Sequence, residues 1–308
     1  MAARSNPTVR IAELYAFDRR IRSAVASGSM PDEGPHPAKA PTAEHAKNAE
    51  HYYYKKEGFL CELGGLRGEP KRNLGGAVSS KPATTPPEGK PISLAGLDEA
   101  GRGALAGPVV VGCVRFDLEK SILHRLIGLN DSKRLSPIKR ERLFTQITEI
   151  AHYGIGQATP REIDRYGIVP AVCLASRRAY HKLGAPVDLL LLDRGISLVG
   201  FTAEDAKAAE NRCKKEKFLC DLSVLCGKYP PELSFTRGDT LSMHIAAASI
   251  IAKVVRDRYM IERGRDFPEY GFERHKGYGT RAHLATLERH GPSPIHRTSF
   301  RLTGTNRC

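Results

Sequence analysis

Short apolar runs alternate along residues 92–290 with longer segments in which apolar residues recur at helical spacing. The short runs predict strands at Ile92–Leu97, Pro108–Phe116 and Val187–Leu192. The longer segments predict helices at Pro137–His152, Val169–Leu183, Ser242–Arg263 and Arg281–His290. A glycine-rich turn separates the first two strands, which is typical of a hairpin-like pair. Strands that alternate with helices bury their apolar faces in layers, so the pattern predicts an α/β domain.

The composition is that of a globular protein. Of the 308 residues 41% are hydrophobic, which is enough for a packed core. No apolar run approaches the roughly 18–20 residues of a membrane helix. The first residues lack the apolar stretch of a signal peptide, and Glu13 and Asp18 interrupt the arginines that would suggest a transit peptide. The seven cysteines include no CxxC pair, so we expect neither a zinc site nor a disulfide framework, and a cytoplasmic location.

Residues 1–90 differ from the rest of the chain. Residues 27–43 and 63–91 are rich in Gly, Pro, Ser and Lys without steady periodicity, which is typical of linkers or disorder. Only Val9–Ala26 has the pattern of a short helix. We therefore predict a largely linker-like extension over 1–90 and a domain over 91–308.

A peptide occurs twice, at 42–63 and at 202–222, with a match at most positions and one gap. Two copies are fewer than the three or more that a solenoid needs. We interpret both copies as inserted peptides unrelated to the chemistry; a pair of partner-binding helices is the alternative. Without residues 202–229, 18 positions separate Asp193 from Asp239, which is an ordinary connection. Since loop closure entropy grows slowly with length, we expect activity to survive this insertion.

The charge of the chain suggests a polyanionic partner. The formal net charge is +14, and residues 237–308 hold 13 Lys and Arg against 7 Asp and Glu, with five of the 11 His. Positive charge that is concentrated in one segment is the expected footprint of phosphate binding. A basic protein without a special ligand is the alternative.

Two adjacent carboxylates, Asp98 and Glu99, stand at the end of the first predicted strand. Neighbouring side chains of a regular strand point to opposite faces, so the two would share one site only if the strand ends or bends there. Gly101 and Gly103 allow such a bend and let a ligand approach the backbone closely. A buried carboxylate is unfavourable unless it is paired or bound to metal. The alternative is an ordinary hairpin turn with solvated acids.

Two further carboxylates precede or follow predicted elements. Asp193 ends a buried strand, a position beyond which ligands bind in open α/β sheets, although it is equally a simple turn residue. Asp239 precedes the long helix and is equally a candidate N-cap. Four carboxylates without a Cys/His set suit Mg²⁺ or Mn²⁺ rather than zinc. A carboxylate cluster in a basic protein is what two-metal phosphodiester hydrolysis requires.

Several motifs follow one another in order along the chain. They are DEAGRG at 98–103, Asp131-Ser132-Lys133, LLLLD at 189–193, RGD at 237–239 with IAAASIIAKVVRDR at 245–258, and HKGYGT at 275–280 with Pro294-Ile295-His296-Arg297. Together they resemble the motifs of ribonuclease HII. The resemblance covers about 91–193 and 233–301. It implies an α/β fold of the ribonuclease H-like kind, with a mixed sheet flanked by helices and a helical C-terminal portion that closes over the duplex.

The resemblance also implies an activity and its metal ligands. The chain would hydrolyse the RNA strand of RNA–DNA hybrids and cut 5′ to ribonucleotides embedded in duplex DNA, leaving 3′-hydroxyl and 5′-phosphate ends. It would act with Mg²⁺ or Mn²⁺. Nothing in the sequence suggests obligate assembly, so we expect a monomer, and the lack of a long apolar run leads us to expect no membrane partner. The metal-binding and catalytic carboxylates of the family would fall on Asp98, Glu99, Asp193 and Asp239.

The same resemblance implies substrate-binding residues. Gly101, Arg102 and Gly103 would contact the ribose 2′-hydroxyl, which distinguishes RNA from DNA. Tyr278 would stack on the sugar of the following deoxynucleotide. Lys133 and Lys276 would contact phosphates. From their sequence positions alone, Tyr278 is equally a packed turn aromatic and the two lysines are equally solvated side chains.

Two departures from the family pattern bear on the site. Arg237 stands where the family usually has Lys, and the two side chains are not interchangeable at a fixed site. Arg194 stands where a small residue is more usual, so it would crowd the site or pair with Asp193. Two rival functions stay open: a non-catalytic nucleic-acid binder that keeps the fold, and a partner-binding protein in which the repeated peptides are the functional part.

Overall fold

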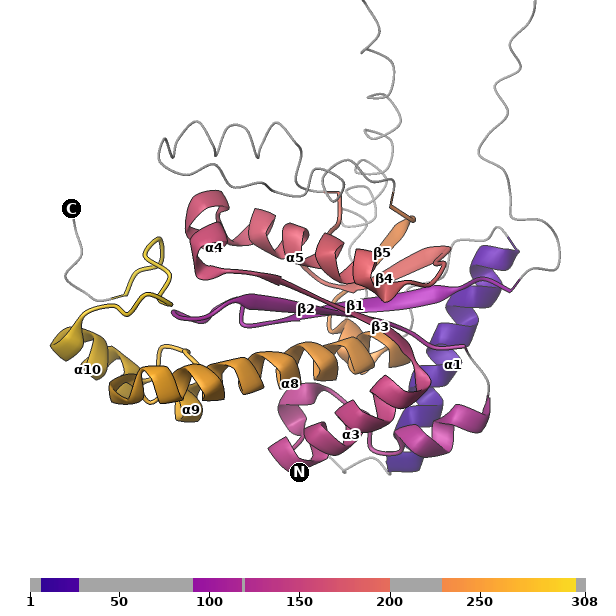
Figure 1. Cartoon of the computed structure of the whole chain (residues 1–308). Coiled ribbons are helices and arrows are strands. Elements are labelled where there is room, and N and C mark those ends of the chain that lie inside the picture. Colours follow the sequence, from indigo (N-terminus) through magenta and orange to yellow (C-terminus); the bar gives the residue numbers. More distant parts are fainter. Residues whose placement is uncertain (1–6, 28–90, 118–119, 200–228, 303–308) are drawn as a thin grey trace, which may run out of the picture. The chain divides into compact units, whose positions relative to one another are not determined.

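A five-stranded mixed sheet lies at the centre of the computed structural model, which describes residues 7–27, 91–117, 120–199 and 229–302 (Figure 1). Its strands are β1 (Leu94–Ala100), β2 (Val109–Arg115), β3 (His152–Ala158), β4 (Leu189–Asp193) and β5 (Glu232–Phe235). The strand order is β3-β2-β1-β4-β5, with antiparallel pairs β1–β2 and β2–β3 and parallel pairs β1–β4 and β4–β5. The three predicted strands and the hairpin-like pair are therefore confirmed.

Two strands were not predicted. The helix expected over 137–152 ends at Ile150, and β3 begins at His152. Gly154 and Gly156 interrupt the apolar pattern of β3, and β5 has only four residues. Both strands form because their neighbours in the sheet offer unpaired backbone groups, a tertiary effect that local propensity does not report.

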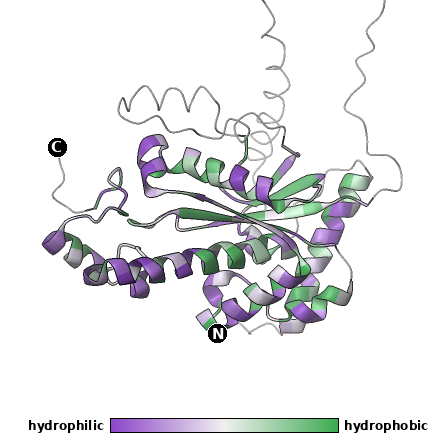
Figure 2. Cartoon of the chain, in the orientation of Figure 1, coloured by the Kyte–Doolittle hydropathy of each residue, from purple (hydrophilic) through white to green (hydrophobic). Residues whose placement is uncertain are grey.

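Helices cover both faces of the sheet. They are α1 (Pro7–Ala26), α3 (Pro137–Ile150), α4 (Pro160–Tyr166), α5 (Ile168–Leu183), α8 (Met243–Asp266), α9 (Phe272–His275) and α10 (Arg281–His290), with 3-10 helices at Lys120–Leu126, Ser132–Arg134, Gly238–Thr240 and Pro268–Tyr270. Helices α4 and α5 lie on one face, and α1, α3 and α8 on the other (Figure 1). Figure 2 shows that the strands between these layers are mainly hydrophobic and that hydrophilic residues gather on the outer helices. This is the predicted layered α/β architecture.

Strand glycines bring the two long helices close to the sheet. A Cβ on Gly112 would lie 2.5 Å from the carbonyl oxygen of Ala248 in α8, and a Cβ on Gly156 would lie 1.9 Å from that of Ala175 in α5. Neither position accepts a side chain without a shift of backbone. The small residues Ala246–Ser249 are buried against the sheet, which confirms the close packing expected of this tract.

The distal half of α8 carries a small helical lobe. Helices α9 and α10 pack on it around a separate apolar cluster, which includes Met260, Phe272 and Leu287 (Figure 1). An isolated bridge between Ala106 and His296 joins this lobe to the segment between β1 and β2. The helical C-terminal portion that the resemblance implied is thus present.

Helix α1 belongs to the same compact unit as residues 91–308. The prediction placed it within an extension apart from the domain, but its apolar residues, such as Leu14 and Phe17, are buried in the domain core. The fully buried carboxylate of Asp18 accepts hydrogen bonds from the backbone N–H of Met243 (2.9 Å) and contacts His244 Nδ1 (2.8 Å). A carboxylate at the start of α8 stabilises the first turn of that helix.

No helix among the described residues is long and apolar enough to cross a membrane. Both copies of the repeated peptide lie outside the described residues, as do the low-complexity segments before β1. The flanks of the second copy are described. Glu232 in β5 accepts hydrogen bonds from the N–H of Leu198 (2.7 Å) and from the hydroxyl of Ser197 (3.0 Å), so the two ends of the insertion leave the domain at one place.

Tyr229 belongs to the domain rather than to the insertion that we predicted over 202–229. Its ring packs against the main core cluster, 5.7 Å from the ring of Tyr180, and lies under the Arg177 guanidinium at 5.3 Å.

We therefore expect deletion of residues 202–228, closed by a short glycine linker, to leave kcat within about twofold, since loop length changes closure entropy only slowly. Deletion of 202–229 should lower the melting temperature because it removes the Tyr229 packing. Circular dichroism melts and hybrid cleavage would measure both, and a folded 202–228 deletion that loses activity would contradict the prediction.

Candidate active site

Asp98 and Asp193 lie side by side at the ends of two parallel strands. Leu97 of β1 pairs with Leu192 of β4, so the next residue of each strand is one of the aspartates. The carboxyl ends of neighbouring parallel strands meet at one edge of a sheet, where α/β proteins place their ligands. The predicted position of Asp193 at the end of a buried strand is confirmed.

Asp98 is buried, with 7% of its surface exposed, on the face of β1 that packs against α8. Burial raises the pKa of Asp98 well above its ordinary value, and the negative charges of Glu99 and Asp193 raise it further. A hydrogen bond with Ser249 of α8 opposes this rise. A solvated hairpin turn, the alternative left open by the sequence, does not describe this environment.

Glu99 reaches the same neighbourhood although β1 does not end or bend at Asp98. The strand continues through Ala100 in register with β2. Burial raises the pKa of Glu99, the Arg102 guanidinium lowers it from 3.7 Å away, and the charge of Asp193 raises it. The carboxylates interact because β4 stops at Asp193, which leaves the adjacent edge of β1 uncovered.

Asp239 comes from the turn before α8. It is buried, and the N–H of the preceding Gly238 donates a hydrogen bond to Asp193 Oδ1 (2.7 Å). Burial and the charges of Asp131 and Asp193 raise the pKa of Asp239 to about 6. The side chains of Asp239 and Asp131 also share a hydrogen bond. Asp239 therefore belongs to the carboxylate group that contains Asp98, Glu99 and Asp193.

The N-cap of α8 is Ser242, not Asp239. The Ser242 hydroxyl accepts hydrogen bonds from the backbone N–H of His244 (3.2 Å) and of Ile245 (3.3 Å). The capping role that the sequence left open for Asp239 is therefore taken by another residue, and its carboxylate is available for the site.

The two departures from the family pattern flank the carboxylates. Arg237 is exposed and adopts the left-handed conformation (φ 58°), which costs a non-glycine residue about 1 kcal/mol. The N–H and hydroxyl of Thr240 both donate to its carbonyl and hold this turn. Arg194 is exposed, and within the described residues neither a hydrogen bond nor an ion pair joins it to Asp193.

Lys133 faces the carboxylates from the loop before α3. Its partial burial acts to lower the pKa of its ammonium group, but the charges of Asp98 and Asp239 raise that pKa overall. The neighbouring Ser132 hydroxyl bonds to the Ser249 hydroxyl at 2.8 Å, which fixes the loop against α8. Lys133 is thus a cation beside a group of like negative charges.

The donor set fits a hard divalent cation. Asp98, Glu99, Asp193 and Asp239 present only carboxylate oxygens, and Glu99 Oε2 is buried without a hydrogen-bond partner among the described residues. Within the described part of the chain, no three His, Cys, Asp or Glu side chains converge on one point that would hold an ion. Mg²⁺ is commonly held by only one or two carboxylates, with water and substrate phosphates as its other ligands. Asp98, Glu99, Asp193 and Asp239 are therefore the residues that would hold such an ion together with water and substrate phosphates.

The turn after β1 is built on two fully buried arginines. Gly101 has a positive φ of 91°, and its carbonyl and that of Arg102 accept hydrogen bonds from Arg297 (2.7 and 2.9 Å). A Cβ on Gly101 would lie 1.9 Å from Arg256 Nε, whereas a Cβ on Gly103 would meet no atom of the described residues within 4 Å. The turn is therefore rigid behind Gly101 and open to a ligand at Gly103.

Tyr278 lies in the loop between α9 and α10, which is tied to this turn. The carbonyl of Gly277 accepts hydrogen bonds from the N–H of Leu105 (2.8 Å) and of Ala106 (3.3 Å). The preceding Lys276 is left-handed (φ 52°), and His283 contacts the Tyr278 carbonyl at 3.0 Å. Tyr278 is thus part of the same framework as the segment that follows the glycine turn.

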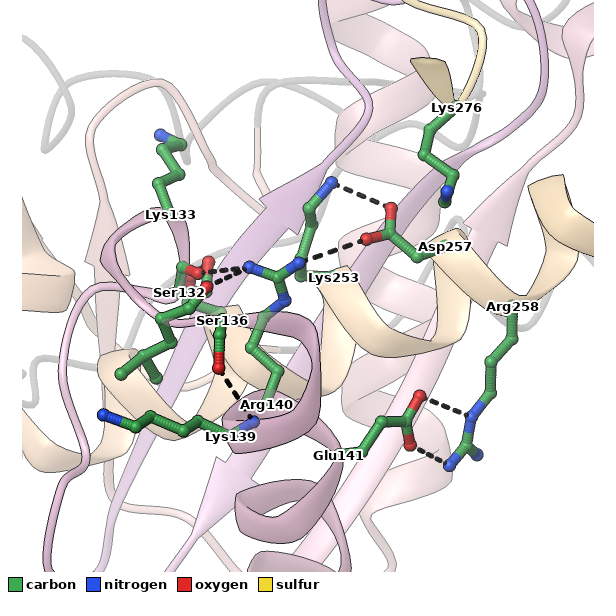
Figure 3. Close-up of polar contacts among 12 residues, drawn as sticks. Ser132, Lys133, Ser136, Lys139, Arg140, Glu141, Lys253, Asp257, Arg258 and Lys276 are labelled. Atoms are coloured by element: carbon green, nitrogen blue, oxygen red, sulfur yellow. Dashed lines mark hydrogen bonds and ion pairs between the residues drawn. The ribbon is translucent and has the colours of Figure 1, made fainter. Parts of the chain in front are cut away.

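Lys276 does not lie among the carboxylates. Burial lowers its pKa, and the charge of Asp257 of α8 opposes this shift. Asp257 accepts a hydrogen bond from Lys253 (2.8 Å) and lies 3.7 Å from Arg140 of α3. Figure 3 shows Lys133 and Lys276 on either side of this ion-paired group. The two predicted phosphate contacts therefore belong to different parts of the site.

Sequence reasoning missed three residues of the site. Asp131 stood within a quoted motif, but its carboxylate was not predicted to meet Asp239. Arg256 and Arg297 also stood within quoted motifs, yet both are fully buried and bind backbone carbonyls. An arginine in a basic segment suggests a surface phosphate contact, so only the fold could reveal these roles.

The sequence model of ribonuclease HII matches residues 95–303, more than half of the chain. The chain belongs to the ribonuclease HII family. It is an enzyme of this family, an endonuclease of the kind that cleaves RNA–DNA hybrids. Membership excludes the rival interpretations in which the protein is a non-catalytic binder or acts only through its repeated peptides. Helix α1 lies outside the matched residues.

Known proteins resemble the chain over the same region. Ribonuclease HII of Syntrophotalea carbinolica is 44% identical over 213 residues, which cover 68% of this chain and 85% of the relative. That of Thermotoga maritima is 44% identical over 208 residues, 67% and 72% of the two chains. A chain in the structure of the PCNA:RNase HII complex from Archaeoglobus fulgidus has a TM-score of 0.50 at 22% identity and covers 68% of this chain and 96% of that one. The last comparison supports the ribonuclease H-like fold.

The raised pKa of Asp239 predicts a stabilising substitution. A neutral Asp239 stabilises the fold fully below its ordinary pKa of 3.8, and this contribution is lost as the pH rises through about 6. At pH 7 without divalent metal we expect Asp239→Asn to raise the melting temperature by about 2–4 °C, which corresponds to about 1 kcal/mol at this size. The gain should vanish near pH 4.

Circular dichroism melts in a chelating buffer at pH 4 to 7 would measure this difference. Glu288→Gln, on the exposed surface of α10, is the matched control and should have no effect. Added Mg²⁺ should stabilise the wild type more than Asp239→Asn. A lower melting temperature for Asp239→Asn at pH 7 would contradict the repulsion between the carboxylates.

The two glycines of the turn predict opposite effects. Gly103→Ala should fold normally and lower kcat/KM about tenfold or more through KM, because its Cβ would enter the open space. Gly101→Ala should destabilise the fold by about 2 kcal/mol or more, because it combines a positive φ with the contact to Arg256. Melts and steady-state kinetics would separate the two, and unchanged kinetics for Gly103→Ala would show that substrate does not approach this turn.

Proposed function

We propose that the chain hydrolyses the phosphodiester bond on the 5′ side of a ribonucleotide embedded in duplex DNA, besides the RNA strand of RNA–DNA hybrids. The products would carry 3′-hydroxyl and 5′-phosphate ends. One observation carries the proposal: Asp98, Glu99, Asp193 and Asp239 gather at the open end of the sheet, where the negative charges of neighbouring carboxylates raise the pKa of Asp98, Glu99 and Asp239. Such a cluster is unfavourable in a folded protein unless it serves a cation.

These four carboxylates would hold Mg²⁺ or Mn²⁺, since carboxylate oxygens suit both ions. When bound, the metal ions supply an activated water and stabilise the leaving oxygen of the phosphodiester. The chain contributes the geometry. Hydrogen bonds from Gly238 to Asp193 and from Ser249 to Asp98 orient two of the carboxylates before any ligand binds. Lys133 offsets part of their charge and would meet a substrate phosphate beside them.

The turn at Gly101, Arg102 and Gly103 would select the ribose. A 2′-hydroxyl both donates and accepts hydrogen bonds, so rigid backbone groups within reach distinguish RNA from DNA. The open space at Gly103 admits such an approach, and the buried Arg297 holds the turn in place. Lys276 would contact a phosphate farther along the duplex, where the net positive charge of the C-terminal segment also acts.

Tyr278 would stack on the sugar of the deoxynucleotide that follows the ribonucleotide. Its loop is bonded to Leu105 and Ala106, which closely follow the turn that would bind the 2′-hydroxyl, and this supports a fixed relation between the two recognition elements. This linkage suits cleavage where RNA meets DNA. We also propose that the protein acts as a monomer; its cytoplasmic location stays a prediction.

A duplex DNA with one internal ribonucleotide tests the proposal. With Mg²⁺ or Mn²⁺, we expect the wild type to cut once on the 5′ side of the ribonucleotide. Asp193→Asn should lower kcat at least about a thousandfold, as expected when a metal ligand of a hydrolase is lost. Tyr278→Ala should lower cleavage of this substrate more than cleavage of a uniform RNA–DNA hybrid.

Product ends would be identified by labelling with and without prior phosphatase treatment, and Glu288→Gln provides the control variant. Cleavage of the uniform hybrid without any cut at the single ribonucleotide would disprove the proposed specificity. Full activity of folded Asp193→Asn would disprove the carboxylate assignment.

A further inference from the structure

Two cations of α8 lie over the ring of Tyr278. Lys253 Nζ is 5.6 Å from the ring centroid, and Arg256 Cζ is 5.0 Å from it. Both distances fall within the roughly 6 Å at which a cation is attracted to an aromatic face. The two residues are three positions apart, so their side chains leave the same face of the helix. The predicted stacking residue is thus held by two positive charges on one rigid element.

Arg256 is fixed by the backbone around the glycine turn. It is fully buried, and it donates hydrogen bonds to the carbonyls of Pro108 and Ala106 at 3.0 Å each. Its Nη1 has no hydrogen-bond partner among the described residues. A buried guanidinium N–H without an acceptor is unfavourable, so the contact with an aromatic ring is one of the few interactions that offset its desolvation. Arg256 therefore contacts both the turn that includes Gly101 and Tyr278.

Lys253 is fixed by an ion-pair network rather than by the backbone. Its ammonium group binds Asp257 one helical turn along α8 at 2.8 Å, and its side chain is 19% exposed. Asp257 also lies 3.7 Å from Arg140, whose guanidinium donates to the carbonyls of Ser132 and Leu135 (Figure 3). The position of this ammonium group is therefore set by the loop that carries Lys133 as well as by α8.

A tyrosine in a surface loop would otherwise lose rotamer freedom only when substrate binds. Holding the ring in advance removes that loss from the binding step. A ring held against α8 also keeps a constant relation to the glycine turn, because Arg256 contacts both. The benefit applies only to substrates on which the ring stacks, so it changes specificity rather than general affinity.

We propose that Lys253 and Arg256 are positioning residues that hold the Tyr278 ring ready to stack on a deoxyribose, and thereby set the preference for cleavage at an RNA–DNA junction. This inference rests on the proposed role of Tyr278. It gives the two cations a function beyond phosphate attraction. Direct phosphate binding by Lys253 would instead favour all duplex substrates alike.

A double-mutant cycle separates these possibilities. The readout is the ratio of kcat/KM for a duplex with one ribonucleotide to kcat/KM for a uniform RNA–DNA hybrid, measured in the full chain with Mg²⁺. We expect Lys253→Met to lower this ratio about fivefold, or about 1 kcal/mol. In a Tyr278→Ala background the same substitution should have no further effect, since its partner is already absent.

Arg258→Met is the matched control. This exposed cation of α8 lies 4.5 Å from the centroid of another ring, Phe144, and pairs with Glu141. Its substitution should leave the ratio unchanged. Arg256→Lys keeps the positive charge but loses the guanidinium that binds the two carbonyls, so the kcat/KM ratio of this variant should also fall. A circular dichroism melt would establish that the variant is folded. The double-mutant cycle with Lys253 does not depend on this variant.

Each outcome of these measurements either supports or overturns the inference. An equal loss on both substrates that persists in the Tyr278→Ala background would show that Lys253 binds phosphate and would overturn the inference alone. A ratio for Lys253→Met that matches Arg258→Met would overturn it as well. If Tyr278→Ala leaves the ratio unchanged, the proposed role of the tyrosine fails, and this inference fails with it.

Discussion

Repulsion among four buried or half-buried carboxylates is the constraint around which the described domain is arranged. Asp98 and Asp193 meet because two parallel strands end together, and Asp239 joins them through a hydrogen bond from its neighbour Gly238 to Asp193. Burial and the neighbouring negative charges raise the pKa of Asp98 and of Asp239, so ionisation of these two carboxyls is disfavoured in the folded chain. The apolar packing of two helical layers on the sheet provides the stability that offsets this repulsion. The site is thus strained electrostatically in a way that favours divalent cations.

The second organising feature is the use of buried arginines as backbone supports. Arg256 and Arg297 donate to carbonyls of the segment between β1 and β2, including those of Gly101 and Arg102. Burial lowers the pKa of Arg297 to about 9, which shows how strongly its charge is desolvated. A buried guanidinium is tolerated because its hydrogen bonds to carbonyls replace those it would make with water. Removing either partner would leave an unpaired buried group. The turn that would recognise ribose is therefore a rigid surface.

Helix α1 lies outside the region that matches the family, yet it packs against the domain. Its apolar face packs on the domain core, and the Asp18 carboxylate accepts a hydrogen bond from the N–H of Met243 in the first turn of α8. Composition had suggested a linker-like extension, because the low-complexity residues around α1 dominate that part of the sequence. The periodicity of Val9–Ala26 did predict the helix, but no local signal indicates which surface an amphipathic helix will cover.

Local patterns in the sequence determined the α/β class, three strands, the main helices and the identities of the four carboxylates. They succeeded because apolar periodicity and strand-ending acids are properties of single segments. Strands β3 and β5 escaped detection, since hydrogen bonds from neighbours outweigh the weak propensity of their own residues. Only the tertiary structure decided that Asp131 meets Asp239 and that Arg256 lies against Tyr278. Both contacts join elements that are far apart in sequence. The packing of the layers decides which of these side chains are buried and which charges interact.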